Sequence, residues 1–285
     1  MKLLIFGMGY SGKAIAQRWP GEVVGTTRSA ERVAELKKDG FEAVVFNGQL
    51  TDELAAHLRS ATHIVLSASP SEQGDPVLNA IPDFFEKAAA LKWLGYLSTV
   101  GVYGDFDGAW ISEDTKPNPV SKRGKWRVDA EQKWAEYARK VGVSFAIFRL
   151  AGIYGPGRST FDKLRNGKSR RIVKPGQVFN RIHVEDIAQI VNAAAAMQAT
   201  GVFNGADDEP APPNLVIEHA AQMLGIDPPP EEPFETADMT PMARSFYGDN
   251  KRCGNSRLKK DLGLSLKYPT YREGLQSILE QENSK

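Results

Sequence analysis

The sequence predicts an α/β fold in which a doubly wound parallel sheet carries a small, discontinuous C-terminal lobe. Short apolar runs alternate with segments of helical periodicity, as strands buried on both faces alternate with crossover helices. The first run leads directly into the glycine-rich segment 7–12, and the regular alternation stops after Leu150. A chain of 285 residues is long enough for one large α/β domain with an appended lobe.

The predicted elements alternate along the first half of the chain. Apolar runs predict six strands, at 2–6, 22–26, 43–46, 63–67, 95–98 and 144–150. Helical periodicity predicts five helices, at 13–19, 30–38, 52–59, 77–91 and 120–141. Right-handed crossovers between parallel strands would place these helices on both faces of the sheet.

Beyond Leu150 the pattern becomes irregular, with glycine, proline and a run of basic residues. Residues 184–197 are an exception, because their apolar positions repeat at helical spacing and should pack back on the sheet. We therefore predict a dinucleotide-binding domain of residues 1–155 plus 183–204. The small substrate lobe would comprise residues 156–182 plus 205–285.

Composition excludes several classes of function. Lysine and arginine total 36 against 35 acidic residues, so the net charge of +1 provides no broad field for nucleic acid or an anionic membrane. A single cysteine, Cys253, excludes an intramolecular disulfide and a cysteine zinc cluster, and the isolated His183 supports no metal site. No signal peptide or stretch of about 18 apolar residues is found. We expect a cytoplasmic protein with a small-molecule substrate and no metal.

The segment Gly7-Met8-Gly9-Tyr10-Ser11-Gly12 follows a strand and opens a helix, which is the context in which G-x-G-x-x-G spacing predicts a dinucleotide site. Gly7 would permit the tight turn, Gly9 the approach of a pyrophosphate, and Gly12 close packing of helix on strand. The helix start offers free N–H groups to phosphates. We predict Gly7, Gly9, Tyr10, Ser11 and Gly12 as cofactor ligands in a Rossmann-type domain; a purely structural glycine turn is the alternative.

The end of the second strand should decide between NADP and NAD. An acidic residue there would bind the free ribose hydroxyl of NAD, but the chain has Thr27, Arg28 and Ser29. The guanidinium of Arg28 suits a 2′-phosphate, with two hydroxyls beside it. NADP is therefore favoured over NAD, and a solvated arginine at a helix start is the alternative.

Several motifs together resemble the short-chain dehydrogenase/reductase superfamily, in its extended branch of NAD(P)-dependent epimerases and dehydratases. Besides the glycine turn, these are Leu97-Ser98-Thr99-Val100-Gly101-Val102-Tyr103-Gly104, Arg149-Leu150-Ala151-Gly152-Ile153-Tyr154-Gly155-Pro156-Gly157 and Arg181-Ile182-His183-Val184-Glu185-Asp186-Ile187-Ala188. The resemblance implies that Ser67 and Ala68 line the cofactor trough. It also implies that helices 77–91 and 120–141 could form a homodimer.

The chemistry of that superfamily implies a hydroxyl at the end of strand five, a tyrosine acid/base and a lysine four residues later. Thr99 matches the hydroxyl position. Counting back from Glu131, a frequent glutamate of the family, places Arg123 at the tyrosine position and Arg127 at the lysine position. Arginine cannot release a proton near neutral pH. Arg123 therefore cannot act as the tyrosine does, whereas Arg127 could still hold the ribose hydroxyls.

Three interpretations of this departure stay open. Lys122 or Lys125 could act as acid/base with a pKa lowered by the crowded cations, or Tyr103 or Tyr154 could replace the usual tyrosine. In both cases the protein would be an enzyme, and its candidate catalytic residues include Thr99, Tyr103, Lys122, Arg123 and Arg127. In the third, the chain is a non-catalytic NADP-binding sensor or regulatory protein.

We expect an oxidoreductase, epimerase or dehydratase that acts on a polar carbonyl or hydroxyl substrate, either nucleotide-sugar-linked or anionic. A basic run favours a phosphate or carboxylate on the substrate, and a solvated charge run is the alternative. The run comprises Arg158, Lys163, Arg165, Lys168, Arg170, Arg171, Lys174 and Arg181. The sequence predicts neither the individual substrate nor the direction of hydride transfer.

Overall fold

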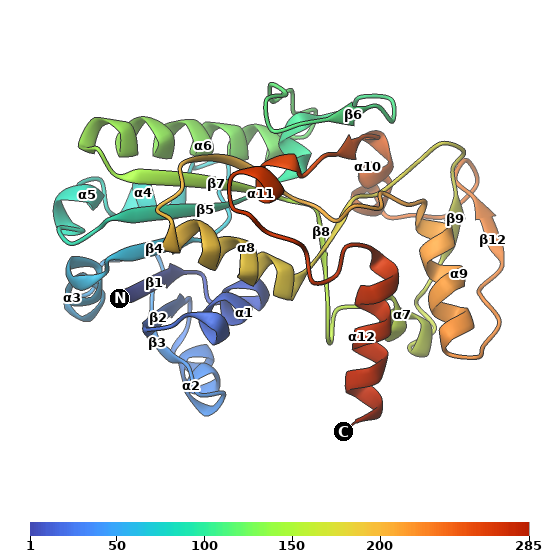
Figure 1. Ribbon diagram of the computed structural model, residues 1–285, viewed down its shortest axis with the longest axis horizontal. Helices are drawn as coiled ribbons and strands as arrows, with labels where there is room; N and C mark the ends of the chain where they lie inside the picture. Colours follow the sequence, from blue (N-terminus) through green and yellow to red (C-terminus); the bar gives the residue numbers. More distant parts are fainter. Residues whose placement is uncertain (285) are drawn as a thin grey trace.

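A seven-stranded parallel sheet forms the centre of the computed structural model, which describes residues 1–284 (Figure 1). Its strand order is β11-β7-β5-β4-β1-β2-β3, and every neighbouring pair is parallel. The strands are β1 (Lys2–Phe6), β2 (Glu22–Thr27), β3 (Glu42–Val45), β4 (His63–Leu66), β5 (Trp93–Thr99), β7 (Ser144–Leu150) and β11 (Gly201–Gly205). The predicted doubly wound α/β fold is confirmed.

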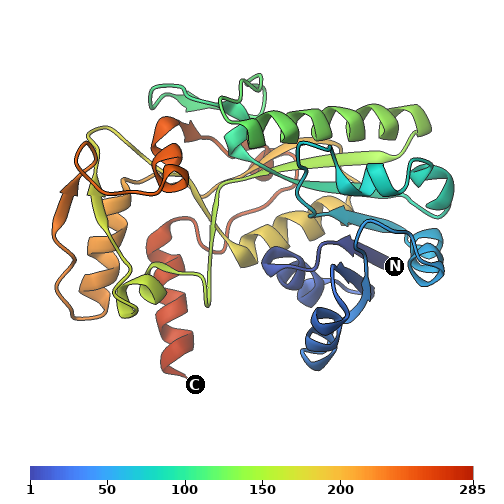
Figure 2. The same ribbon diagram turned by 180° about the vertical axis from the view of Figure 1, so that it is seen from behind.

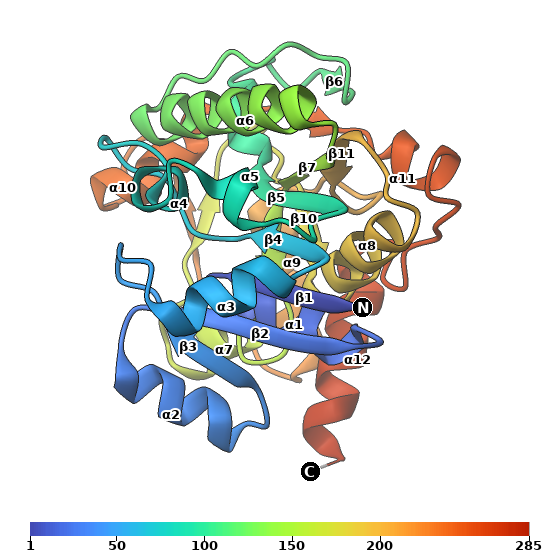
Figure 3. The same cartoon turned by 90° about the vertical axis from the view of Figure 1, so that its left-hand side faces the viewer.

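Helices cover both faces of this sheet, which Figure 3 shows nearly end-on. Alternate residues of β1 enter two separate apolar clusters, because successive strand side chains point to opposite faces. Leu3 and Ile5 belong to one cluster, and Leu4 and Phe6 to the other. The first cluster includes side chains of α1 (Tyr10–Arg18), α2 (Ala30–Lys38) and α8 (Val184–Ala196). The second includes side chains of α3 (Asp52–Ser60), α4 (Pro76–Ala80), α5 (Phe84–Lys87) and α6 (Lys122–Val141).

The structure differs from the prediction at two elements. The single helix predicted at 77–91 is two short helices, α4 and α5, separated at Pro82. A proline disfavours helical backbone in the residue before it, and Ile81 adopts φ −134° and ψ 74°. The seventh strand, β11, was not predicted as a strand. Its five residues include Gly201, Asn204 and Gly205, so no continuous apolar run marks it.

Most of the remaining elements form a lobe beside the carboxyl edge of the sheet (Figures 1 and 2). Its apolar cluster is built by α7 (Thr160–Arg165), α9 (Pro213–Met223) and α12 (Tyr271–Asn283). Three small parallel pairs join distant segments: β8 (Gly152–Tyr154) with β10 (Arg181–His183), β9 (Arg171–Val173) with β12 (Glu231–Pro233), and β6 (Trp110–Ile111) with β13 (Arg252–Cys253).

The second half of the chain also contributes to the sheet domain. Leu258, in α11 (Ser256–Lys260), and Leu262 pack into the first cluster together with strand residues of the central sheet. The exact division into 1–155 plus 183–204 and 156–182 plus 205–285 stays a prediction. Among residues 1–284, no helix has the length and apolar character needed to cross a membrane.

Candidate functional site

The predicted cofactor residues meet at the carboxyl edge of the sheet. The strand order runs outward in opposite directions from β1 and β4, so the chain leaves these two neighbouring strands toward opposite sides. Open α/β sheets bind ligands in the crevice at such a reversal. The glycine turn follows β1, Ser67 and Ala68 follow β4, and Thr99 ends β5. Elements far apart in sequence therefore place these residues along one edge.

Two glycines of the turn are required by packing. Gly7 has φ +98°, and a Cβ there would lie 3.1 Å from the backbone nitrogen of Ala68. A Cβ on Gly12 would lie 3.0 Å from the carbonyl oxygen of Gly7. The N–H of Gly7 donates to Oγ1 of the buried Thr26 at 3.0 Å. The turn is thereby held against the ends of β2 and β4.

Gly9 is different, because a Cβ built there would have no neighbouring atom within 4 Å among the residues described. It is the N-cap of α1 and supplies no side-chain cap, whereas Ser29, Thr51 and Ser121 cap α2, α3 and α6. Protein packing therefore does not account for this glycine. The uncapped helix start leaves N–H groups and a positive dipole end facing the space beside Gly9, and these fit a pyrophosphate.

The other predicted residues of the turn are partly occupied by protein contacts. The hydroxyl of Tyr10 donates to the carbonyl oxygen of Pro156 at 2.9 Å, and burial raises its pKa to about 12. The Arg158 guanidinium lies 5.7 Å from the centre of the Tyr10 ring. Ser11 is 8% exposed, in the first turn of α1. Tyr10 therefore connects the glycine turn to the segment that enters the lobe.

The predicted adenosine-end residues lie between β2 and α2. Ser29 caps α2 by accepting a hydrogen bond from the N–H of Arg32 at 3.3 Å. Thr27 is half-buried at the end of β2. Arg28 is exposed, and it makes no ion pair or side-chain hydrogen bond with any residue of 1–284. No carboxylate occupies the position that would bind a free 2′-hydroxyl.

At the end of β5, the neighbouring hydroxyls of Ser98 and Thr99 point to opposite sides. The Oγ1 of Thr99 accepts from the N–H of Gly101 at 3.1 Å and caps the short helix η1 (Val100–Tyr103). Thr99 remains half-buried at the sheet edge, while Ser98 is 6% exposed and donates to Glu131. The Thr99 hydroxyl has this structural role, and its proton is still available to a ligand.

The first turns of α6 form a wall beside the carboxyl ends of β4 and β5. The Arg127 guanidinium donates to the carbonyl oxygen of Leu97 at 2.8 Å and to Oγ of Ser69 at 3.2 Å, and it lies 5.5 Å from the centre of the Tyr96 ring. Arg127 thus bridges strand β5 and the loop after β4.

A pocket of about 310 Å³ lies against this wall. It is lined by Ser69, Pro70, Arg123, Trp126 and Arg127. The two predicted lysines, Lys122 and Lys125, are exposed on the same helix and do not line this pocket.

Burial of both phenols disfavours the hypothesis that Tyr103 or Tyr154 exchanges a proton with substrate. Tyr103 is 0% exposed, its hydroxyl donates to Oδ1 of Asn204 at 2.7 Å, and burial raises its pKa to about 12. Tyr154 is also buried, its hydroxyl donates to the carbonyl oxygen of Thr270, and desolvation raises its pKa further. Both phenols are enclosed by protein, so neither can reach a substrate from its position.

Much of the predicted basic run makes contacts with protein groups within the lobe. Arg165 pairs with Glu282, Arg170 with Glu232, and Arg171 with Glu218 and Glu231. Lys174 donates to the carbonyl oxygen of Tyr247, and Arg181 to the carbonyl oxygens of Phe179 and Ala211. These contacts occupy part of the run, and the binding of a phosphate or carboxylate by its other members stays a prediction. The exposed Arg158 is the member that lies nearest to the glycine turn, through its contact with Tyr10.

His183 has a structural role at the start of α8. Its Nδ1 accepts from the N–H of Glu185 at 3.2 Å and caps α8. The ring is 0% exposed, and burial lowers its pKa from 6.5 to about 4. His183 therefore binds a proton below about pH 6.5 in the unfolded chain, but only below about pH 4 in the folded chain. As the pH falls through this interval, the unfolded state gains protonation that the folded state lacks, so the free energy of unfolding decreases.

Replacing His183 with asparagine should make the pH dependence of stability shallower. Asparagine can still cap α8 but does not titrate. We expect the free energy of unfolding of the native protein to lose about 1–3 kcal/mol more than that of His183→Asn between pH 6.5 and pH 4. Chemical denaturation at several pH values measures this difference. Parallel curves for the two proteins would contradict it.

Sequence reasoning missed a buried polar network beside the site. Glu131 of α6 is 3% exposed and accepts from the Arg149 guanidinium of β7 at 2.7 Å and 3.3 Å, and from Ser98. The Arg149 guanidinium lies 4.7 Å from the centre of the Tyr103 ring, and Tyr103 donates to Asn204 of β11. An arginine within the otherwise apolar strand 144–150 was the signal that could have revealed it. The network fixes β5, α6, β7 and β11 relative to one another.

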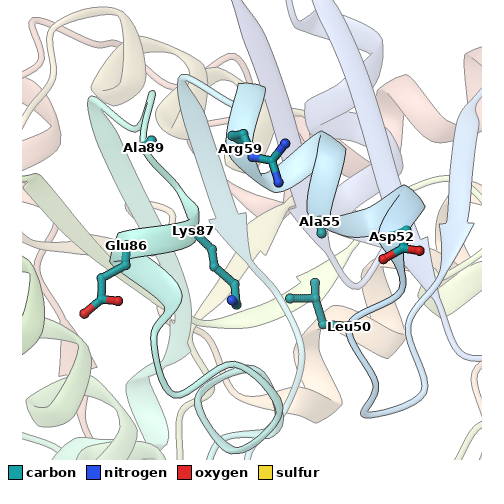
Figure 4. A pocket seen from close by; sticks show the side chains of 7 residues that line it. All are labelled: Leu50, Asp52, Ala55, Arg59, Glu86, Lys87 and Ala89. Atoms are coloured by element: carbon teal, nitrogen blue, oxygen red, sulfur yellow. The ribbon is translucent and has the colours of Figure 1, made fainter.

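A second pocket, of about 400 Å³, lies between α3 and α5 (Figure 4). Its walls include Leu50, Asp52, Arg59, Glu86 and Lys87. None of the predicted cofactor or catalytic residues lines it. The candidate site is therefore the carboxyl edge with its smaller pocket.

Comparison with known proteins agrees with this geometry. The model of the NAD dependent epimerase/dehydratase family matches residues 3–205, which include the glycine turn, Thr99 and the start of α6. The chain belongs to this family. It is thus an NAD(P)-dependent epimerase/dehydratase-like protein, as the resemblance implied, and family membership supports binding of a nicotinamide dinucleotide.

Similar proteins cover nearly the whole chain. A solved structure of a functionally unknown conserved protein from Silicibacter pomeroyi DSS is 45% identical, with a TM-score of 0.89 and 99% of each chain covered. Protein YeeZ of Escherichia coli K12 is 27% identical over 281 residues, covering 94% of this chain and 96% of YeeZ. The 3-diazoavenalumate denitrifying reductase of a Streptomyces species is 29% identical over 265 residues, covering 84% of this chain and 74% of that reductase.

Proposed function

We propose that this family member uses NADP in preference to NAD, and that it transfers hydride to or from a small polar substrate at the carboxyl edge of the sheet. Two observations together support the proposal. The glycine turn is open and uncapped at Gly9, and Arg28 after β2 has no ion-pair partner among residues 1–284. Gly9 leaves room for a pyrophosphate, and Arg28 offers a guanidinium where an acidic residue would select NAD.

Each group of residues around the site would have its own role in binding or chemistry. Backbone N–H groups at the start of α1 would hold the pyrophosphate, and Arg28 with Thr27 and Ser29 would hold the 2′-phosphate. Ser67 and Ala68 would line the trough beside Gly7, and Arg127 would contact the ribose next to the nicotinamide. When bound, the cofactor supplies or accepts the hydride. The Thr99 hydroxyl would orient the reacting substrate oxygen by donating a hydrogen bond.

The reaction also needs an acid/base group that exchanges a proton with the substrate oxygen. The count from Glu131 places Arg123 at the position of the family tyrosine, and an arginine stays protonated at neutral pH. Since Tyr103 and Tyr154 are buried, the exposed Lys122 and Lys125 are the predicted acid/base groups that remain open to solvent. The similarity to a protein named as a reductase supports redox chemistry rather than cofactor binding alone.

Calorimetric titration of NADPH and NADH tests the cofactor preference. We expect Arg28→Ala to weaken NADPH binding about 10- to 100-fold, because it removes a charge-assisted hydrogen bond to the phosphate, and to leave NADH binding within about twofold. Arg59→Ala, an exposed arginine in the last turn of α3, is the matched control and should change neither affinity. Equal affinities for both cofactors in the native protein, unchanged by Arg28→Ala, would refute the preference for NADP.

A further inference from the structure

We propose that the pocket lined by Ser69, Pro70, Arg123, Trp126 and Arg127 binds the carboxylate end of a small, planar, unsaturated or aromatic acid. This inference rests on the proposed function, since it assigns the substrate class of the same site. The recognised group would be a carboxylate, and the residues of this pocket would recognise it.

The charge on the pocket wall is compensated only in part, because the charge of Arg127 acts on the buried carboxylate of Asp75. Arg123 is exposed, and neither Arg123 nor Arg127 makes an ion pair with a carboxylate in the part of the chain that the structure describes. Glu131, one turn further along α6, is already committed to Arg149 and Ser98. The pocket lining contains no acidic residue. An anion is therefore the ligand that this wall favours electrostatically.

One of the two guanidinium groups is held in place before any ligand binds. Arg127 donates to the carbonyl oxygen of Leu97 and to Oγ of Ser69, and its guanidinium lies over the Tyr96 ring. These contacts restrict the rotation of a side chain that is otherwise flexible. A charge positioned in this way costs a ligand less ordering entropy than a mobile surface arginine does.

The sequence at the start of α6 is unfavourable for the helix itself. Four cations occur between Lys122 and Arg127, at the positive end of the helix dipole, and the first turn contains no acidic residue. In contrast, α3 and α8 carry two acidic residues each in their first turns. Ion pairs along α6 begin only with Asp129 and Lys133. Such a local conflict is expected where function requires the charge, and a bound anion would relieve it.

Size and shape define the rest of the ligand. About 310 Å³ is at the lower end of the range for small-molecule sites, which favours a compact acid over a nucleotide-linked substrate at this position. Trp126 provides an indole beside the guanidinium groups, and an indole packs well on a flat, conjugated surface. A guanidinium fork matches the two oxygens of a carboxylate. Together these features fit a planar acid whose carboxylate faces Arg123.

Binding of trans-cinnamate tests the proposal, with the uncharged trans-cinnamamide as its matched probe. Calorimetry is carried out on the full chain, with and without saturating NADPH. We expect the native protein to bind cinnamate at least tenfold more tightly than cinnamamide. Arg123→Gln should reduce this preference at least tenfold. Arg139→Gln, an exposed arginine in the last turn of the same helix, should leave it within twofold.

Trp126→Leu provides a second variant that keeps the charge and removes the flat indole. We expect it to weaken both probes by a similar factor of about five or more, and thermal melting of each variant verifies that it is folded. Equal binding of cinnamate and cinnamamide, or equal losses in Arg123→Gln and Arg139→Gln, would overturn the assignment of the pocket. Because NADPH is titrated separately, a failure of cofactor binding would be recognised as a failure of the proposed function instead.

Discussion

Glu131→Gln is expected to lower the free energy of unfolding by about 3–5 kcal/mol. Glu131 and Arg149 are 3% and 5% exposed, and the carboxylate accepts two hydrogen bonds from the guanidinium. Glutamine has nearly the same shape but no charge, so the substitution would leave the Arg149 cation buried without its counter-charge. Urea denaturation followed by circular dichroism measures the loss.

The matched control is Glu136→Gln, on the same helix. Glu136 pairs with Lys140 at the surface, and both side chains are more than half exposed. Exposed pairs contribute about 0–1 kcal/mol, so this variant should remain close to the native protein. The double variant Glu131→Gln with Arg149→Met should recover part of the loss, because it removes both members of the buried pair. Similar effects of Glu131→Gln and Glu136→Gln would contradict our description of the network.

Gly9→Ala is expected to reduce the affinity for a nicotinamide dinucleotide about 100-fold, or about 2.7 kcal/mol, without unfolding the protein. A methyl group at this position meets no atom of the described chain within 4 Å, and Gly9 has φ −92°, which any residue can adopt. The methyl group would instead occupy the space through which the pyrophosphate approaches the start of α1. Cofactor titration and thermal melting of the same sample separate the two effects.

Gly12→Ala provides the contrast. Its Cβ would lie 3.0 Å from the carbonyl oxygen of Gly7, so the helix must shift away from the strand. We expect this variant to lose both stability and cofactor affinity, whereas Gly9→Ala should lose affinity alone. Native affinity in Gly9→Ala would show that this glycine does not face the bound cofactor.

Local patterns were sufficient for most of the fold. Strands such as β1 and β4 are buried on both faces, so each appears in the sequence as a continuous apolar run. The glycine turn could be predicted because both positions need a residue without a Cβ. Gly7 has φ +98°, and a Cβ on Gly12 would lie 3.0 Å from the carbonyl oxygen of Gly7. In contrast, β11 escaped prediction, because its place at the sheet edge depends on pairing with β7 rather than on its own residues.

The sequence by itself therefore determined the parallel sheet, the dinucleotide turn and the cationic start of α6, since each follows from residues close together in the chain. Only the tertiary structure decided which polar groups remain available for chemistry. It buried Tyr103 against Asn204, 101 positions away, and paired Arg170 with Glu232, 62 positions away, while Arg28 and Arg123 stayed exposed. Burial and charge compensation depend on distant partners that the fold brings together, and spacing along the chain does not encode them.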